Sequence, residues 1–177
     1  KTMVIACCDA RLDPVKLTGA NCGDLFVVRN IANLIPEYKE SGCGETVAAM
    51  QFAVNFLQIS DIIVLGHSCC GGIASLLSSD NCNNEIGFVN DWMQTAKPAL
   101  DKLDDFCLEN KTEDKTTSCE QLSIVNSLSN CHQYPWVKSR IDQGLLRVHG
   151  WYFDIMSARM FYYNEQAKKF VTMLEHA

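Results

Sequence analysis

The sequence predicts an α/β fold with a mostly parallel central β-sheet flanked by α-helices. Short apolar runs of strand length occur early in the chain, and segments with apolar residues at helical spacing lie between them. Strands that alternate with helices form parallel or mostly parallel sheets, with the helices on the faces. A length of 177 residues fits one domain better than two, so we expect residues 1–177 to form a single domain.

The first half of the chain supplies three predicted strands, at Met3–Cys7, Leu25–Val28 and Ile62–Leu65, the last ending at Gly66. Between the first two, Asp13 followed by Pro14 predicts a helix start, with Asp as the N-cap and Pro at the first helical position. Helical spacing predicts a second helix over Thr46–Leu57, and two glycines open a third over Gly71–Leu77.

The second half is more helical. One helix is expected over Phe88–Leu103, with a kink at Pro98, and a polar surface loop is expected over Cys107–Ser118. Thr117 followed by Glu120 predicts a capping box for a helix that runs through Leu128. A short helix at Pro135-Trp136 and a strand over Leu145–Ile155 follow, whereas the tail from Ser157 gives no clear pattern.

Composition narrows the classes of partner and compartment. The net charge of −6 argues against nucleic acid or an anionic membrane as a partner, and no apolar run is long enough to span a bilayer. The 10 cysteines do not indicate a disulfide framework, because that solution belongs to small chains without a core. We therefore expect a reducing compartment: the cytoplasm, or an organelle interior if a transit segment has been removed.

Two segments carry the residues that suggest chemistry: Cys7-Cys8-Asp9-Ala10-Arg11 and His67-Ser68-Cys69-Cys70-Gly71-Gly72. Each directly follows a predicted parallel strand, and ligands of such sheets gather at the carboxyl ends of the strands. An extended backbone would place Cys7, Asp9 and Arg11 on one side, because alternate residues share a side. Spacing alone leaves open the choice between Cys7 and Cys8 and that between Cys69 and Cys70, and alternation with Asp9 favours Cys7.

Two thiolates and one imidazole form a typical zinc set, and Asp9 is a fourth group whose availability depends on Arg11. With Arg11 binding Asp9, the fourth position is open to water, and zinc generates hydroxide near neutral pH. Asp9 would orient that hydroxide toward a small neutral carbon such as that of carbon dioxide. The alternative interpretation of Asp9 and Arg11 is a structural ion pair at a strand end.

These motifs resemble β-carbonic anhydrases, and the His-Ser-x-Cys-Gly-Gly turn is most similar to the plant-type branch. The resemblance rests on Cys7–Arg11, Val28–Asn33 and Gly66–Ile73, and it continues through Val125-Asn126 and Tyr134–Trp136 into the last predicted strand. It implies zinc ligands at Cys7, His67 and Cys70, and an Asp9–Arg11 catalytic dyad.

The resemblance also implies a homodimer or higher homo-oligomer, in which apolar side chains from the neighbour line the pocket. Phe26 and Phe52 match those positions, and Phe52 stands where the family often has tyrosine. Ala10 replaces the usual serine of the Asp-Ser-Arg motif. The family's N-terminal arm and a substrate-binding glutamine would lie ahead of Lys1, so we expect the chain to be a trimmed piece.

The expected activity is therefore the reversible hydration of carbon dioxide to bicarbonate and a proton by zinc-bound hydroxide, with backbone N–H groups near Gly71 helping to hold bicarbonate. Three alternatives remain open: hydrolysis of carbon disulfide or carbonyl sulfide on the same scaffold, a non-enzymatic zinc-binding module, and a thiol redox protein. The absence of a Cys-x-x-Cys motif argues against the last.

The other candidate residues are expected to be structural. Arg29 is expected to tie loops together, His149 to be a strand histidine rather than a proton shuttle, and His132 and His176 to lie on the surface. Small core fillers are expected at the remaining cysteines: Cys8, Cys22, Cys43, Cys69, Cys82, Cys107, Cys119 and Cys131.

Overall fold

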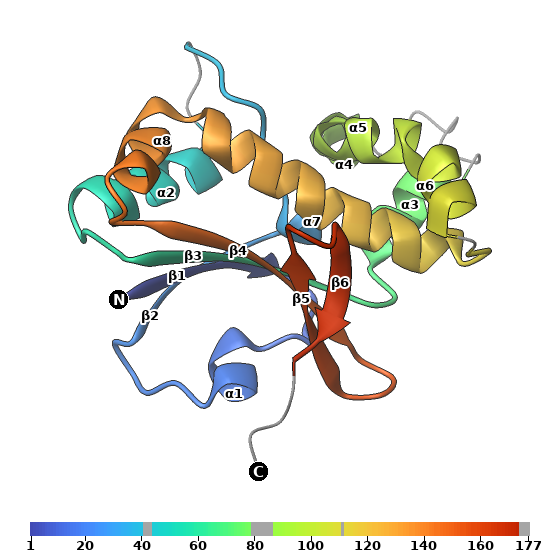
Figure 1. Ribbon diagram of the computed structural model, residues 1–177, viewed down its shortest axis with the longest axis horizontal. Coiled ribbons are helices and arrows are strands. Elements are labelled where there is room, and N and C mark those ends of the chain that lie inside the picture. Colours follow the sequence, from blue (N-terminus) through green and yellow to red (C-terminus); the bar gives the residue numbers. More distant parts are fainter. Residues whose placement is uncertain (41–43, 79–86, 111, 174–177) are drawn as a thin grey trace.

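A six-stranded sheet in the order β2-β1-β3-β4-β5-β6 organises the computed structural model, which describes residues 1–40, 44–78, 87–110 and 112–173 (Figure 1). The strands are β1 (Thr2–Cys7), β2 (Leu25–Asn30), β3 (Asp61–His67), β4 (Arg147–Asp154), β5 (Arg159–Asn164) and β6 (Lys169–Thr172). The first four are parallel to one another, and β5 and β6 are antiparallel additions at one edge. This confirms the mostly parallel sheet and all four predicted strands.

The tail from Ser157, for which the sequence gives no clear pattern, forms β5 and β6. Its turns place Ala158 and Lys168 at positive φ, 53° and 50°. Glycine or asparagine usually occupies such positions, so the ordinary sequence signal for a hairpin is missing here. Neither strand alternates cleanly between buried and exposed residues, which hides the two-residue period as well.

The helices lie mainly on one side of the sheet, with α1 on the other (Figure 1). They are α1 (Pro14–Thr18), α2 (Glu45–Asn55), α3 (Gly71–Leu77), α4 (Gly87–Met93), α5 (Lys97–Asp101), α6 (Leu103–Asn110), α7 (Lys115–Gln133) and α8 (Pro135–Asp142). As predicted, Asp13 caps α1, and its carboxylate accepts hydrogen bonds from the backbone N–H groups of Val15 and Lys16. The predicted helices at α2, α3 and α8 are also confirmed.

The single kinked helix predicted over Phe88–Leu103 is wrong. The segment is divided into α4, a 3-10 turn at Gln94–Ala96, and α5. Pro98 lies in the first turn of α5, where its missing N–H costs no intrahelical hydrogen bond. The proline therefore helps to start a new helix rather than to bend one continuous helix.

The surface loop predicted over Cys107–Ser118 is also wrong in large part, because α6 continues to Asn110 and α7 begins at Lys115. The predicted capping box is wrong for the same reason. Asp114 is the N-cap of α7, and its carboxylate accepts a hydrogen bond from the Thr117 backbone N–H. Glu120 consequently lies inside the helix rather than in its first turn, and it is buried.

The central strands are buried on both faces, which explains their continuous apolar sequences. In β1, Met3 and Ile5 belong to one apolar cluster, and Val4 and Ala6 belong to another. The longest helix, α7, crosses above β3 and β4 (Figure 1) and contacts both strands. Among the helices that the structure describes, none combines the length and apolar character that a bilayer crossing requires.

Candidate active site

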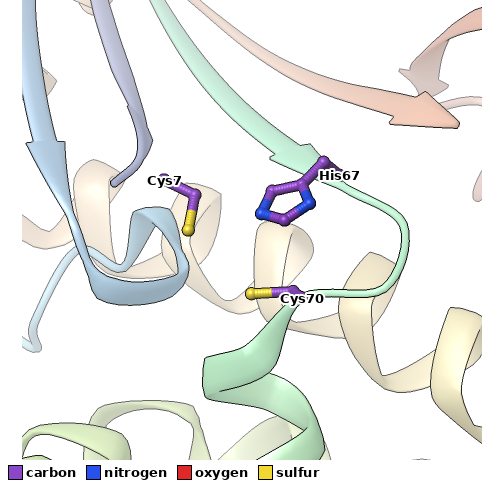
Figure 2. A group of neighbouring side chains, drawn as sticks. All are labelled: Cys7, His67 and Cys70. Carbon is purple, nitrogen blue, oxygen red and sulfur yellow. The ribbon is translucent and has the colours of Figure 1, made fainter. Parts of the chain in front are cut away.

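Cys7, His67 and Cys70 converge at the carboxyl end of the central strands (Figure 2). Cys7 ends β1, His67 ends β3, and Cys70 directly precedes α3. Their candidate ligand atoms all lie within 4.8 Å of one another, and all three residues are buried. Because β1 and β3 are adjacent and parallel, their ends deliver both segments to one place, as the sequence predicts.

The His67 ring is oriented by its own chain. Its Nδ1 lies 2.9 Å from the Ser68 carbonyl oxygen, which requires Nδ1 to carry the proton and to donate. The other nitrogen, Nε2, is buried and makes no hydrogen bond within the described residues. A buried ring nitrogen with a free lone pair beside two sulfur atoms is the arrangement expected of a metal ligand.

The two sulfur atoms also fit a cation. A hydrogen bond from the Cys70 thiol lowers the pKa of Cys7, and the same interaction raises the pKa of Cys70. The two thiols therefore resist ionising together, whereas a divalent ion would stabilise both thiolates. Two thiolates and a neutral imidazole are donors that suit zinc, so these residues fit that ion.

Asp9 and Arg11 form a paired unit next to these residues. Arg11 donates from Nε to Asp9 Oδ1 at 2.9 Å and from Nη2 to Oδ2 at 2.6 Å, and its backbone N–H also reaches Oδ1. These hydrogen bonds hold the pKa of the Asp9 carboxyl well below its usual range. Asp9 therefore stays ionised and is held by Arg11.

The extended backbone predicted from Cys7 to Arg11 is wrong beyond Asp9, although the Cys8 N–H still donates to Asn30 of the neighbouring strand. The Leu12 N–H donates to the Asp9 carbonyl at 3.0 Å, so the chain turns there. Asp9 and Arg11 meet across this turn, in which the Arg11 backbone N–H binds the Asp9 side chain, and not through strand alternation. The predicted proximity of the two side chains holds, but its geometric reason differs.

Arg29 fixes this turn from the neighbouring strand β2. Its Nε donates to the Cys7 carbonyl at 2.9 Å, and its Nη2 donates to the carbonyls of Asp9 and Leu12 at 2.6 and 2.7 Å. This confirms the prediction that Arg29 ties loops together. It also fixes the backbone that carries both Cys7 and Asp9.

Phe26 and Phe52 are not brought to Cys7, His67 and Cys70 of the same chain. Phe26 pairs with Met3 in the sheet, toward the end of β1 opposite to Cys7. Its ring lies 6.1 Å from that of Phe52, which is 47% exposed. A lining role for these rings therefore requires a neighbouring chain and stays a prediction. Gly71, by contrast, begins α3 directly after Cys70.

Several side chains behind the site are not identified by the sequence analysis. Ser68 donates from Oγ to Asp154 at 3.0 Å, and Glu120 accepts hydrogen bonds from the Cys70 backbone N–H and the Tyr152 hydroxyl. A signal for Glu120 does exist. It lies four residues before Ile124, in a row of α7 whose members are buried, so a charge stands where an apolar residue is expected.

The expectations for the other cysteines and histidines are partly confirmed. Cys107, Cys119 and Cys131 are buried as predicted. The prediction of core positions is wrong at three exposed cysteines, which lie in loops and turns outside the strands and helices: Cys8, Cys22 and Cys69.

The expected positions of the histidines hold where the structure describes them. His149 is a β4 residue whose Nε2 lies 2.9 Å from Asp61 Oδ1, and His132 is exposed. Cys43, Cys82 and His176 lie outside the described residues.

Comparison with known proteins gives a consistent result. The sequence model of the family described as carbonic anhydrase matches residues 2–160. A curated relative, β carbonic anhydrase 5, chloroplastic, from Arabidopsis thaliana, is 39% identical over 156 residues, which is 88% of this chain. The match covers 52% of that relative, so the chain spans about half the length of the curated protein.

Solved structures match over most of the chain. The β-carbonic anhydrase CcaA superposes with a TM-score of 0.89 at 34% identity, covering 97% of this chain and 83% of CcaA. One of two tetrameric β-carbonic anhydrases from Sordaria macrospora superposes with a TM-score of 0.77 at 27% identity, covering 91% of this chain and 79% of the other.

Proposed function

Because the chain belongs to the β-carbonic anhydrase family, we propose that it is a zinc-dependent lyase that interconverts carbon dioxide and bicarbonate. The observation that carries this proposal is the convergence of Cys7, His67 and Cys70, with the unpartnered Nε2 of His67 beside two thiols. These three residues would hold the ion. Zinc bound there would supply Lewis acidity, which lowers the pKa of coordinated water toward neutrality.

The chain's own residues would then orient the reactants. Arg11 occupies the Asp9 carboxylate through two side-chain hydrogen bonds, which keeps it from serving as a further ligand. Asp9 remains an acceptor at any working pH because its pKa is depressed, so it would fix the orientation of a hydrogen-bond donor such as water. Its low basicity also means that it would not retain the proton released on hydration, which would pass to solvent.

The substrate pocket is proposed to be completed from two sources. The backbone at Gly71 would help to bind bicarbonate, since an anion is favoured near the start of a helix. Phe26 and Phe52 of a neighbouring subunit would supply apolar walls suited to carbon dioxide. Exposed aromatic rings support a homodimer or larger homo-oligomer. The rings of Phe52 and Phe56 are stacked with their centroids 5.3 Å apart, and Phe56 is 74% exposed.

We further propose that residues 1–177 act as one catalytic domain in a reducing compartment, either the cytoplasm or an organelle interior. The sheet supports the first point, because β4, β5 and β6 extend the same sheet that begins with β1. The eight described cysteines are all free, and this supports the second. Small carbon substrates and a second copy of the chain are the proposed partners, and nucleic acid and membranes are not.

Stopped-flow measurement of carbon dioxide hydration by the zinc-loaded protein tests the activity. Turnover is expected at about pH 7 and should rise toward about pH 8.5, because coordinated water ionises in that range. No turnover at either pH, with one zinc per chain, would contradict the proposal. Parallel assays with carbonyl sulfide and carbon disulfide would then separate another substrate from a protein that only binds zinc.

A further inference from the structure

We infer that Glu120 is a positioning residue for the zinc site, which holds the ligand Cys70 in place and thereby slows release of the ion. The inference rests on the proposed zinc site and concerns a residue outside it. Glu120 lies in α7, it is not one of the three converging ligand residues, and its side chain hydrogen-bonds the Cys70 backbone and the Tyr152 hydroxyl.

Both oxygens of the Glu120 carboxylate are engaged by different parts of the fold. Oε1 accepts a hydrogen bond from the Cys70 backbone N–H at 2.9 Å, and Oε2 accepts one from the Tyr152 hydroxyl at 2.8 Å. Cys70 precedes α3, and Tyr152 belongs to β4. One side chain therefore joins helix α7, strand β4 and the residue that carries a candidate zinc ligand.

Burial of the Glu120 carboxylate is unfavourable unless hydrogen bonds compensate for the lost water. Glu120 is 3% exposed, and no Lys, Arg or His side chain forms an ion pair with it among the described residues. A buried carboxylate without a cationic partner is unfavourable, so its two hydrogen bonds are its main compensation. Because the Cys70 N–H is one of these donors, the carboxylate and the ligand residue fix each other.

The turn that Glu120 holds, Ser68–Cys70, has a strained backbone. Cys69 has a φ of 57°, a left-handed conformation that is uncommon for a residue other than glycine. The turn is anchored at each residue by a different element: Ser68 by Asp154 of β4, the Cys69 carbonyl by Arg11, and the Cys70 N–H by Glu120. Strained backbone persists where its surroundings over-determine it. Loss of the Glu120 contact would free the end of the turn that bears the Cys70 sulfur.

A simpler role for Glu120 would be to satisfy a buried N–H, which stabilises the fold without acting on zinc. The two roles differ in their consequences. A purely structural role lowers the melting temperature and leaves ion binding unchanged once the protein is folded. A positioning role alters the rate of zinc release and the geometry around the ion, and the glutamine variant should rescue both because its amide oxygen can still accept from Cys70.

The experiment uses the zinc-loaded protein and its E120A, E120Q and S123A variants. Ser123 is the matched control, because it lies in α7, is fully buried, and donates only to its own helix at the Cys119 carbonyl. Zinc transfer to a chelating dye gives the release rate, and the visible spectrum of the Co²⁺-substituted protein reports on ligand geometry. Thermal melting of each variant is measured alongside.

We expect E120A to release zinc about 10- to 100-fold faster than wild type and to shift the Co²⁺ spectrum. E120Q and S123A should stay close to wild type in both measurements. Unchanged zinc release and an unchanged spectrum in folded E120A would overturn the inference. So would S123A and E120A releasing zinc equally fast with the same loss of melting temperature.

If E120A does not fold, Y152F decides the question, because it removes the hydrogen bond that holds Oε2 and so leaves the carboxylate that positions Cys70 fixed at only one of its oxygens. Faster zinc release in Y152F than in S123A supports the inference, and equal rates refute it. None of these measurements uses carbon dioxide. A protein that lacks hydration activity would therefore leave the inference about Glu120 intact. Unchanged zinc release in E120A would likewise leave the proposed hydration activity intact.

Discussion

Two residues at this site, His67 and Asp9, owe their chemical state to contacts within a few positions of themselves. His67 shows this most simply, because its Nδ1 binds the carbonyl of the next residue and so leaves Nε2 with a lone pair. Asp9 likewise meets Arg11 two residues later, across a turn. Such local contacts fix the tautomer of one group and the ionisation of the other before any ligand arrives.

The substitution D9A should separate zinc binding from turnover of carbon dioxide. Zinc content should stay at one per chain, because Asp9 is not one of the three converging ligands, whereas kcat/KM for carbon dioxide should fall roughly 100-fold with the loss of an orienting acceptor. Stopped-flow hydration together with metal analysis measures both quantities. An active D9A protein with full zinc would remove Asp9 from the proposed mechanism.

At the scale of elements, the approach of α7 to the sheet depends on two glycines. A Cβ at Gly66 would lie 2.7 Å from Ile124 Cδ1, and a Cβ at Gly150 would lie 2.9 Å from Ile124 Cγ2. Gly66 directly precedes His67, so the distance between α7 and β3 also affects the backbone of a candidate ligand. The same close packing brings Glu120 of α7 within reach of Cys70.

G66A should therefore destabilise the protein by about 1–3 kcal/mol through overpacking against Ile124. The I124V substitution removes the closest atom, so the G66A/I124V double variant should be more stable than the sum of the single effects predicts. Urea unfolding of all four proteins gives the coupling energy. Strict additivity would show that the added methyl group is accommodated elsewhere.

Asp61, the first residue of β3, joins that strand to β4 through Arg147 and His149. Burial by itself raises the pKa of Asp61, but these hydrogen bonds outweigh it and hold the pKa at about 2. Because the folded-state pKa is depressed, the resulting stability is present above the unfolded-state pKa of about 3.9 and is lost as the pH falls toward 2.

D61N should accordingly cost about 1 kcal/mol of unfolding free energy at pH 7, a modest value because Arg147 is largely exposed. The difference between wild type and D61N should shrink as the pH falls from about 5 toward the folded-state pKa. Denaturant titrations across that range test this. A difference that is constant with pH would mean that the ionised form of Asp61 contributes nothing.

What the sequence reveals about these elements depends on whether the signal is local. The strand ends with Cys7 and His67 are predictable, because buried parallel strands are continuous apolar runs and these two runs end directly at Cys7 and His67. The charge of Glu120 in a buried row of α7 is a sequence signal, but its role is not predictable, because its partners Cys70 and Tyr152 are distant in the chain and only α7 packing brings them together. Strands β5 and β6 are not predictable in this way, because the turns that precede them place Ala158 and Lys168, rather than glycine, at positive φ.

At the scale of the whole molecule, the candidate zinc site takes its ligands from segments that are far apart in the chain. Cys7 and His67 are brought together only when β1 pairs with β3, so the complete ligand set belongs to the folded state. An ion that binds the native state and not the unfolded chain adds its binding free energy to the stability of the whole sheet.

Zinc loading should therefore raise the melting temperature. At a free zinc concentration about 100 times the dissociation constant, the gain is about 2.7 kcal/mol, which for a chain of this size corresponds to roughly 5–10 °C. Calorimetry of the zinc-loaded and chelator-treated proteins measures the shift. Identical melting temperatures would argue that the three residues do not bind the ion in the native state.

Strand β1 lies in the interior of the sheet, between β2 and β3, and runs from Thr2 to Cys7. Its first residue therefore lies at the amino ends of the parallel strands, and its thiol lies at their carboxyl ends. Six residues of strand span roughly 17 Å. A tether, fluorophore or solid support joined through Lys1 would thus attach at the amino ends of the strands, remote from the metal ligands. Immobilised in that orientation, the protein would present the carboxyl ends of the strands, and with them the candidate zinc site, to dissolved gas.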